Sequence, residues 1–140
     1  AHLTHPERLD TVMGCVSDKF RSGVVIPHWC MKLFINAYTT PGTDMNDPRL
    51  SPMFYDASKF PKYVAVACGD ADTLYRMSFD LMKKISGSAS GTNVDGSRKF
   101  ICVLNEAHEF NTFGRTRASQ EERDRVEGEA INMIRASWRQ

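Results

Sequence analysis

An acidic residue and a histidine each follow a short apolar run of this 140-residue chain. Asp72 comes shortly after the run 63–68, and His108 comes shortly after the run 100–104. A carboxylate that accepts a hydrogen bond from an imidazole holds the ring in one tautomer, so that its other nitrogen can act as a general base. Together the two residues would activate a nucleophile, provided that the fold brings their side chains together.

The two apolar runs predict neighbouring strands of a parallel sheet. Both are short, continuous and rich in valine or isoleucine, which is typical of strands buried on both faces. Residues 73–85, between them, have apolar side chains at helical spacing. A strand, helix and strand in this order form a parallel crossover unit, whose strand ends meet at one edge of the sheet. We therefore expect Asp72 and His108 at that edge, where catalytic groups gather in open α/β sheets.

The remaining elements predict an α/β domain that is incomplete. Further helices are expected from Pro27 to the Pro41-Gly42 break and over 119–138, and the irregular connection 41–61 contains apolar residues that favour packing. Two apolar parallel strands cannot cover both of their own faces. We therefore interpret residues 1–140 as one partial domain at one end of a larger sheet.

Composition excludes some classes of protein. The chain is 41% hydrophobic and 25% charged, with a formal net charge of +1, which is ordinary for a soluble globular protein and gives no electrostatic reason to expect a nucleic-acid partner. No apolar run approaches the ~18 residues of a membrane span, so none is expected.

The cysteines and histidines predict no metal site and no cofactor. His2, His5, His28 and Cys30 are interpreted as belonging to a chain terminus and a helix face, because no further cluster completes a tetrahedral site. None of the cysteines forms a C-x-x-C pair. Cys68 and Cys102 lie in the apolar runs and are predicted to be buried free thiols, which favours a reducing compartment such as the cytoplasm.

Three segments, taken in order, resemble a known family. Residues 46–52 read NDPRLSP, residues 69–76 read GDADTLYR and residues 106–113 read EAHEFNTF. They are similar to the C-terminal part of the hormone-sensitive-lipase-like branch of the α/β-hydrolases. In that family a G-[DE]-x-D-x-L turn carries the triad acid, and a later H-G-F carries the triad histidine. The resemblance, which covers about residues 27–138, implies that Asp72 is the acid and His108 the base.

This chain departs from the family pattern at several points. Glu109 stands where the family has the glycine of H-G-F, and Thr73 stands where a proline is common. The nucleophile motif G-x-S-x-G and the H-G-G of the oxyanion hole are absent; the nearest string, 87–91, has alanine at its centre. Because the family order is serine, acid, histidine, the resemblance implies that the serine lies upstream of residue 1.

The implied activity is hydrolysis of a small carboxylic ester without a cofactor. The expected partner is an N-terminal hydrolase half that carries G-x-S-x-G, and the chain alone is expected to be inactive. The alternative is a truncated, non-catalytic hydrolase that acts as an interaction module or self-associates through its exposed sheet edge.

Three further interpretations bear on the site. Asp70 is predicted to form the turn and cap the helix that follows, with a role as the triad acid as the alternative. The family builds its substrate cover from the region of the first helix, so Trp29, Phe34 and Tyr38 are candidates for an acyl pocket. Packing in the core is the interpretation that we favour for these three side chains.

Overall fold

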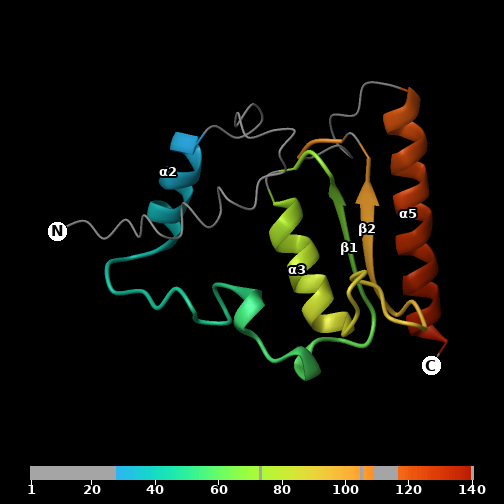
Figure 1. Cartoon of the computed structure of the whole chain (residues 1–140), viewed down its shortest axis with the longest axis horizontal. Helices are drawn as coiled ribbons and strands as arrows, with labels where there is room; N and C mark the ends of the chain where they lie inside the picture. Colours follow the sequence, from blue (N-terminus) through green and yellow to red (C-terminus); the bar gives the residue numbers. More distant parts are fainter. Residues whose placement is uncertain (1–27, 73, 105, 109–116, 140) are drawn as a thin grey trace.

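The computed structural model describes residues 28–72, 74–104, 106–108 and 117–139. Its elements follow in the order α2 (His28–Tyr38), the 3-10 turns η2 (Pro52–Phe54) and η3 (Ala57–Lys59), β1 (Val64–Gly69), α3 (Tyr75–Ser86), β2 (Arg98–Val103) and α5 (Arg117–Trp138) (Figure 1). The fold is mixed α/β. The predicted strands and helices are confirmed, with ends displaced by a residue or two.

β1 and β2 form a parallel pair, joined by α3 as the predicted crossover helix. In their register, Val66 is opposite Phe100 and Cys68 is opposite Cys102. These side chains lie on the α3 side of the sheet, where a core of Cys68, Met82, Ile85 and Phe100 is buried. Both strands pack against this core, and because they are parallel, their carboxyl ends lead to the candidate site side by side.

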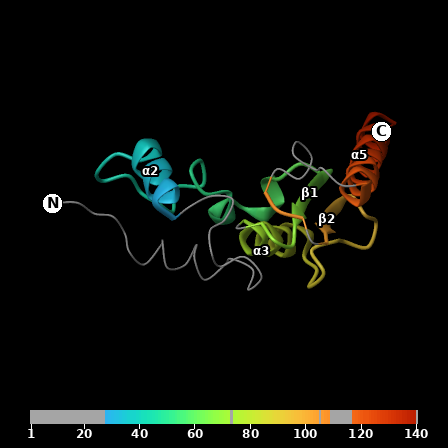
Figure 2. The same ribbon diagram turned by 90° about the horizontal axis from the view of Figure 1, so that it is seen from above.

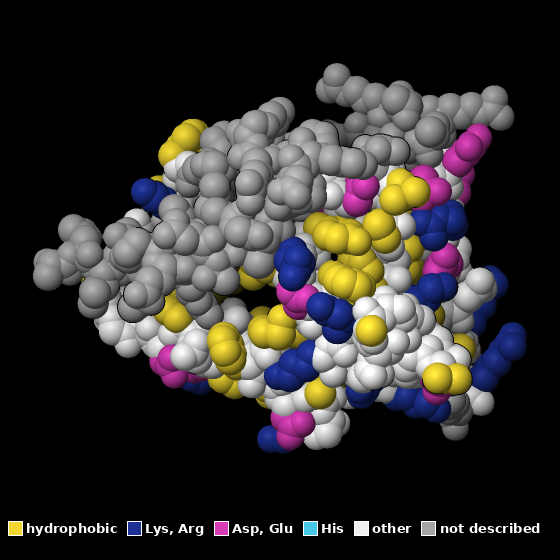
Figure 3. All heavy atoms as spheres, viewed as in Figure 1, with side chains coloured by type: hydrophobic (Ala, Val, Ile, Leu, Met, Phe, Trp, Pro, Cys, Tyr) yellow, Lys and Arg dark blue, Asp and Glu magenta, His cyan; other side chains and the backbone are white. Residues whose placement is uncertain are grey.

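Three aromatic side chains extend this core toward the surface. Phe100 lies 5.1 Å from Phe79 and 5.5 Å from Tyr75, measured between ring centroids. Tyr75 and Phe79 are only half-buried, and hydrophobic side chains are visible at the surface over the α3 region in Figure 3. The α3 side is therefore well packed at the strands and more open at its rim.

The opposite side of the strand pair is covered in part by α5. In Figures 1 and 2, α3 and α5 lie on opposite sides of the strands. On the α5 side, Ile101 and Val103 of β2 are buried, whereas Ala65 and Ala67 of β1 are exposed. The prediction that both strands are buried on both faces is thus wrong for β1, because α5 contacts β1 but leaves Ala65 and Ala67 exposed.

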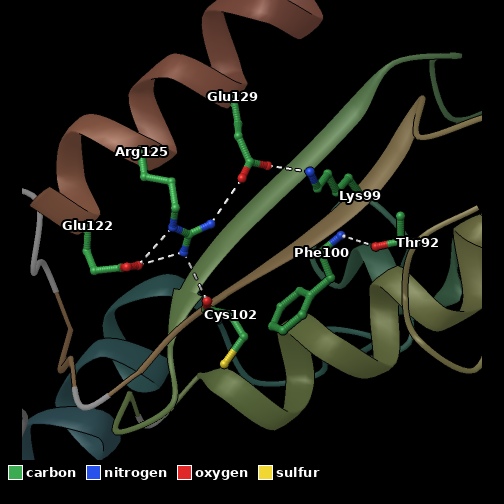
Figure 4. Close-up of polar contacts among 7 residues, drawn as sticks. All are labelled: Thr92, Lys99, Phe100, Cys102, Glu122, Arg125 and Glu129. Carbon is green, nitrogen blue, oxygen red and sulfur yellow. Dashed lines mark hydrogen bonds and ion pairs between the residues drawn. The ribbon is translucent and has the colours of Figure 1, made fainter.

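Two charged side chains of α5, Arg125 and Glu129, attach it to β2 (Figure 4). Arg125 binds Glu122 and Glu129, and its Nη2 also donates to the Cys102 carbonyl at 3.3 Å. Lys99 Nζ lies 2.5 Å from Glu129 Oε2. The hydrogen bonds from Lys99 and the attraction of its charge lower the pKa of Glu129, together with the same effects of Arg125.

We expect Arg125→Ala to destabilise the protein by about 1 kcal/mol. The substitution removes hydrogen bonds from a half-exposed side chain, for which such losses are modest. The measurement is the midpoint of thermal unfolding, with Arg135→Ala in the last turn of the same helix as control, since Arg135 is exposed. Equal midpoints for the two variants would show that Arg125 does not hold α5 in place.

The second half of α5 presents apolar side chains to solvent. Ile131 and Ile134 are about half exposed and Trp138 is 82% exposed. A helix of 22 residues is about 33 Å long, and a strand of 6 residues is about 20 Å long. Part of α5 therefore extends beyond the strands of this sheet.

The connection 41–61 is held in place by side chains of α3 and β2. Lys84 Nζ donates to the carbonyls of Met53 and Tyr55 at 2.6 and 2.8 Å. Arg98 donates to the Phe60 carbonyl at 3.2 Å, and the Phe60 side chain packs against the core. The predicted packing of this connection is confirmed at Phe60 but is wrong for Phe54, which is 48% exposed. The connection leads directly into β1.

Helix α2 lies apart from the strand pair in both views (Figures 1 and 2). Trp29 is 67% exposed, Phe34 56% and Tyr38 84%. The prediction that these side chains pack in the core is therefore wrong for the described part of the chain, because no described element lies against this face. Among the helices that the structure describes, none is both long and apolar enough to cross a membrane.

The two edges of the strand pair differ. Along the outer edge of β2, Phe100 donates its N–H to the Gly91 carbonyl at 3.1 Å, and the Arg98 carbonyl accepts from Asn93 at 3.0 Å. On β1, the Val64 N–H donates to the Ser97 carbonyl on the β2 side. Backbone groups of successive residues point to alternate edges of a strand, so the N–H and C=O groups of Ala65 and Ala67 point to the other edge. No third strand among the described residues lies along that edge. Within the described part of the chain, the β2 edge is thus closed and the β1 edge has no paired strand.

Candidate active site

Asp72 and His108 meet beyond the carboxyl ends of β1 and β2. Asp72 Oδ2 lies 2.9 Å from His108 Nδ1. This agrees with the expected separation of about 2.6–3.2 Å for a base held by its acid and with the predicted parallel arrangement of the strands. Asp72 is 7% exposed, and the His108 side chain is 30% exposed. The predicted pairing of these two side chains is therefore confirmed.

A backbone N–H group holds one oxygen of the Asp72 carboxylate. Its Oδ1 accepts a hydrogen bond from the Leu74 N–H at 2.8 Å, while Oδ2 faces His108. Aspartate commonly bonds the backbone two residues further on, and this bond forms the turn. Because each oxygen has its own partner, the carboxylate has little freedom to rotate away from the imidazole.

The interpretation of Asp70 as the cap of the following helix is wrong. Helix α3 has Leu74 at its N-cap position and no side-chain cap, and Asp72 is the residue that bonds Leu74. The backbone N–H of Asp70 instead donates to the Val103 carbonyl at 2.9 Å. Asp70 nevertheless lies in the predicted turn, in which the Asp72 N–H donates to the Gly69 carbonyl at 3.1 Å, so only its role as the helix cap is wrong.

Gly69 allows the histidine segment to reach Asp72. A Cβ atom at this position would lie 2.0 Å from the Glu106 carbonyl oxygen. Close by, the N–H of Ala71 donates to that same oxygen at 3.0 Å. The segment that leads to His108 therefore crosses directly over Gly69. No role was predicted for Gly69 from the sequence. The available signal was its place as the first residue of the G-D-x-D motif that carries Asp72.

The geometry sets the tautomer of His108. An ionised carboxylate only accepts hydrogen bonds, so Nδ1 carries the proton when the neutral imidazole faces Asp72. Nε2 is then the nitrogen with a free lone pair, as a general base requires. The pair can take a proton from a nucleophile and later return it to a leaving group.

The buried thiol of Cys68 is not suited to be that nucleophile. Cys68 is buried, as predicted, but Cys102 is only half-buried, and both are free. Burial raises the pKa of the Cys68 thiol to about 12, with a further contribution from the negative charge of Asp72. Because the thiolate is the nucleophilic form, Cys68 stays an unreactive thiol at neutral pH.

Other candidate groups are placed as follows. Among the described residues, no group of three or more His, Cys, Asp or Glu side chains is arranged to hold a metal ion. The positions that depart from the family pattern, Thr73 and Glu109, lie outside the described residues, as do His2, His5 and Cys15.

Comparisons of the chain with protein-family models, with curated proteins and with solved structures found no match. The ordered motifs and the geometry of Asp72 and His108 are therefore the observations from which a function can be inferred.

Proposed function

We propose that this chain supplies the acid and the base of a serine ester hydrolase with the α/β-hydrolase fold, of the hormone-sensitive-lipase-like branch. The observation that carries the proposal is the 2.9 Å contact between Asp72 Oδ2 and His108 Nδ1 beyond the ends of adjacent parallel strands. The order of the three motifs along the chain supports the same family.

In the proposed reaction, Asp72 holds His108 in the tautomer with its proton on Nδ1. His108 Nε2 takes the proton of a serine hydroxyl as the serine oxygen attacks the carbonyl carbon of the ester. The imidazolium then gives this proton to the departing alcohol, which leaves an acyl-serine. Water, deprotonated by the same nitrogen, then attacks the acyl group; as the acyl–serine bond breaks, the imidazolium returns this proton to the serine oxygen and the carboxylic acid is released. The reaction needs no cofactor.

The serine would come from a hydrolase half that carries G-x-S-x-G, since the 140 residues contain no such motif. The open edge of β1 is the place where this half would continue the sheet. The β2 edge is closed by the segment around Gly91 and by Arg125. The backbone N–H and C=O groups of Ala65 and Ala67 point to this edge, where they can pair with a further strand.

The second candidate function is a non-catalytic module that self-associates through the same β1 edge. An open edge is a template for pairing with another chain, so this observation favours both candidates equally. The buried carboxylate, with separate partners for its two oxygens, favours the hydrolase, because desolvating a charge is costly and pairing through a strand edge does not require it.

The test measures hydrolysis of p-nitrophenyl butyrate by the pure chain and by the chain produced together with a G-x-S-x-G half. We expect no turnover by the chain alone, because losing a triad member typically costs about 10⁴–10⁶-fold in rate. The combination should turn over, and a serine-directed organophosphate should abolish its activity.

Organophosphate-sensitive turnover by the chain alone would contradict the proposal. An inactive combination in which the two polypeptides form a stable complex would contradict it as well. In that case, self-association of the chain in sedimentation would favour the interaction module.

A further inference from the structure

Two free thiols face each other across the strand pair. Cys68 on β1 is opposite Cys102 on β2 in the parallel register. Both side chains lie on the α3 side of the sheet, where Cys68 belongs to the buried core and Cys102 packs against it. Cys68 is 5% exposed, whereas Cys102 is only half-buried. The sheet therefore holds two thiols side by side, and one of them can be reached from solvent.

The spacing of the strands is compatible with a disulfide between these two residues. Neighbouring strands lie about 4.7–4.9 Å apart, and disulfides join Cα atoms that are about 4.4–6.8 Å apart. The Cβ atoms of a disulfide are closer, at about 3.5–4.5 Å. Because opposite side chains of a parallel pair point the same way, the bond would draw Cys68 and Cys102 closer together than the strand ladder holds them. We expect such a strained disulfide to be easily reduced.

We propose that Cys68 and Cys102 are a site of reversible oxidative modification, at which a hydroperoxide converts the two thiols into a cross-strand disulfide. The Cys102 thiolate attacks the terminal oxygen of the hydroperoxide, the O–O bond breaks, and the released alkoxide takes up the thiol proton. Cys102 is then a sulfenic acid. The Cys68 sulfur attacks the Cys102 sulfur; the S–S bond forms, the S–O bond breaks, and the released hydroxide leaves as water with the Cys68 proton. The two thiols lose two electrons, which reduce the hydroperoxide to an alcohol and water.

Burial sets the order of these steps. Desolvation is the largest cause that raises the pKa of the Cys68 thiol to about 12, so this thiol does not react with an oxidant from solution. Its attack on Cys102 is instead intramolecular, and well-placed groups of one molecule react as if at concentrations far above any in solution. The sulfenic acid of Cys102 therefore has a resolving thiol beside it, as redox-sensing cysteines often do.

The disulfide would act on the candidate site through the end of β1. Cys68 directly precedes Gly69, over which the segment that leads to His108 crosses. Drawing the strands together next to this crossing would displace it, and with it the contact between Asp72 and His108. This effect on catalysis rests on the proposed function, whereas formation of the disulfide does not.

The test treats the folded full chain with hydrogen peroxide and maps its disulfides by mass spectrometry of peptides. The chain also contains Cys15 and Cys30, which compete for any oxidised thiol. We expect Cys68 to be linked to Cys102 about tenfold more often than any other pair is linked, and dithiothreitol to reverse the link. In urea, where the strand register is lost, the preference should disappear.

Two single substitutions are matched controls for the two steps. In Cys68→Ser the oxidised Cys102 has no resolving partner across the strands, and we expect it to proceed to sulfinic acid. In Cys102→Ser the buried Cys68 should remain a free thiol. If either variant does not fold, the disulfide map of the unmodified chain still decides.

A sulfinic acid at Cys102 of the unmodified folded chain, with Cys68 still a free thiol, would overturn the proposal. A preference for another pair, or an equal preference in urea, would overturn it as well. In the assembled hydrolase, peroxide should lower kcat by up to about 10²-fold, with recovery in dithiothreitol and no loss in Cys102→Ser. A hydrolase that is inactive before peroxide is added would count against the proposed function alone, because the disulfide map still tests the two thiols.

Discussion

Asp72→Asn is expected to lower kcat of the proposed hydrolase assembly by about 10⁴-fold, the size known for the same change in an established triad. The structure gives the reason. The amide oxygen of asparagine would take the bond from the Leu74 N–H that Oδ1 now accepts. Its NH₂ group would then face His108 Nδ1 and donate to it. The ring would adopt the tautomer with its proton on Nε2, which cannot accept the proton of a serine.

Steady-state kinetics on p-nitrophenyl butyrate check this expectation, and the loss should appear in kcat with KM nearly unchanged. Asp70→Asn is the matched control, since Asp70 lies in the same turn and its backbone belongs to the strand ladder. We expect it to stay within about twofold of the unmodified enzyme, as substitutions away from the reacting groups generally do. A larger loss in Asp70→Asn than in Asp72→Asn would transfer the role of the acid to Asp70.

The sequence predicted the parallel pair because its signals are local. The runs 63–68 and 100–104 are continuous and apolar, and the helix between them has clear helical spacing. Strand, helix and strand then leave a single common arrangement, the right-handed parallel crossover. The meeting of Asp72 and His108 follows from this topology, which is why it could be predicted without any spacing rule between them.

Other features depend on neighbours that periodicity does not reveal. Helical spacing shows that α2 and α5 each have an apolar face, but not which element covers it, and Trp29 and Trp138 are largely exposed. The side-chain bond to the backbone before α3 was predicted for Asp70 and is made by Asp72, because the partner depends on where the turn ends to within a residue or two. Sequence patterns place element ends less accurately than that.

Gly69→Ala is expected to remove the contact between Asp72 and His108 without changing either residue. The added Cβ would lie 2.0 Å from the Glu106 carbonyl oxygen, and the segment that leads to His108 would have to move. This oxygen also accepts a hydrogen bond from the Ala71 N–H. Displacing it would break the hydrogen bond that connects the turn before Asp72 to the segment that leads to His108. A shift of about 1 Å in a catalytic group can cost about 10²-fold in rate, and overpacking of this kind destabilises proteins by about 1–3 kcal/mol.

Three measurements on the same variant separate this effect from general unfolding. The Nδ1–H tautomer of His108 should be lost in the ¹⁵N spectrum, kcat should fall about 10²-fold, and the midpoint of denaturant unfolding should decrease. Gly128→Ala in α5 is the control, because a Cβ there meets no atom within 4 Å and alanine favours a helix over glycine by about 1 kcal/mol. It should leave the tautomer unchanged and raise stability slightly. A Gly69→Ala variant that keeps the tautomer and the rate would show that the histidine segment can move aside, and that the crossing over Gly69 does not position His108.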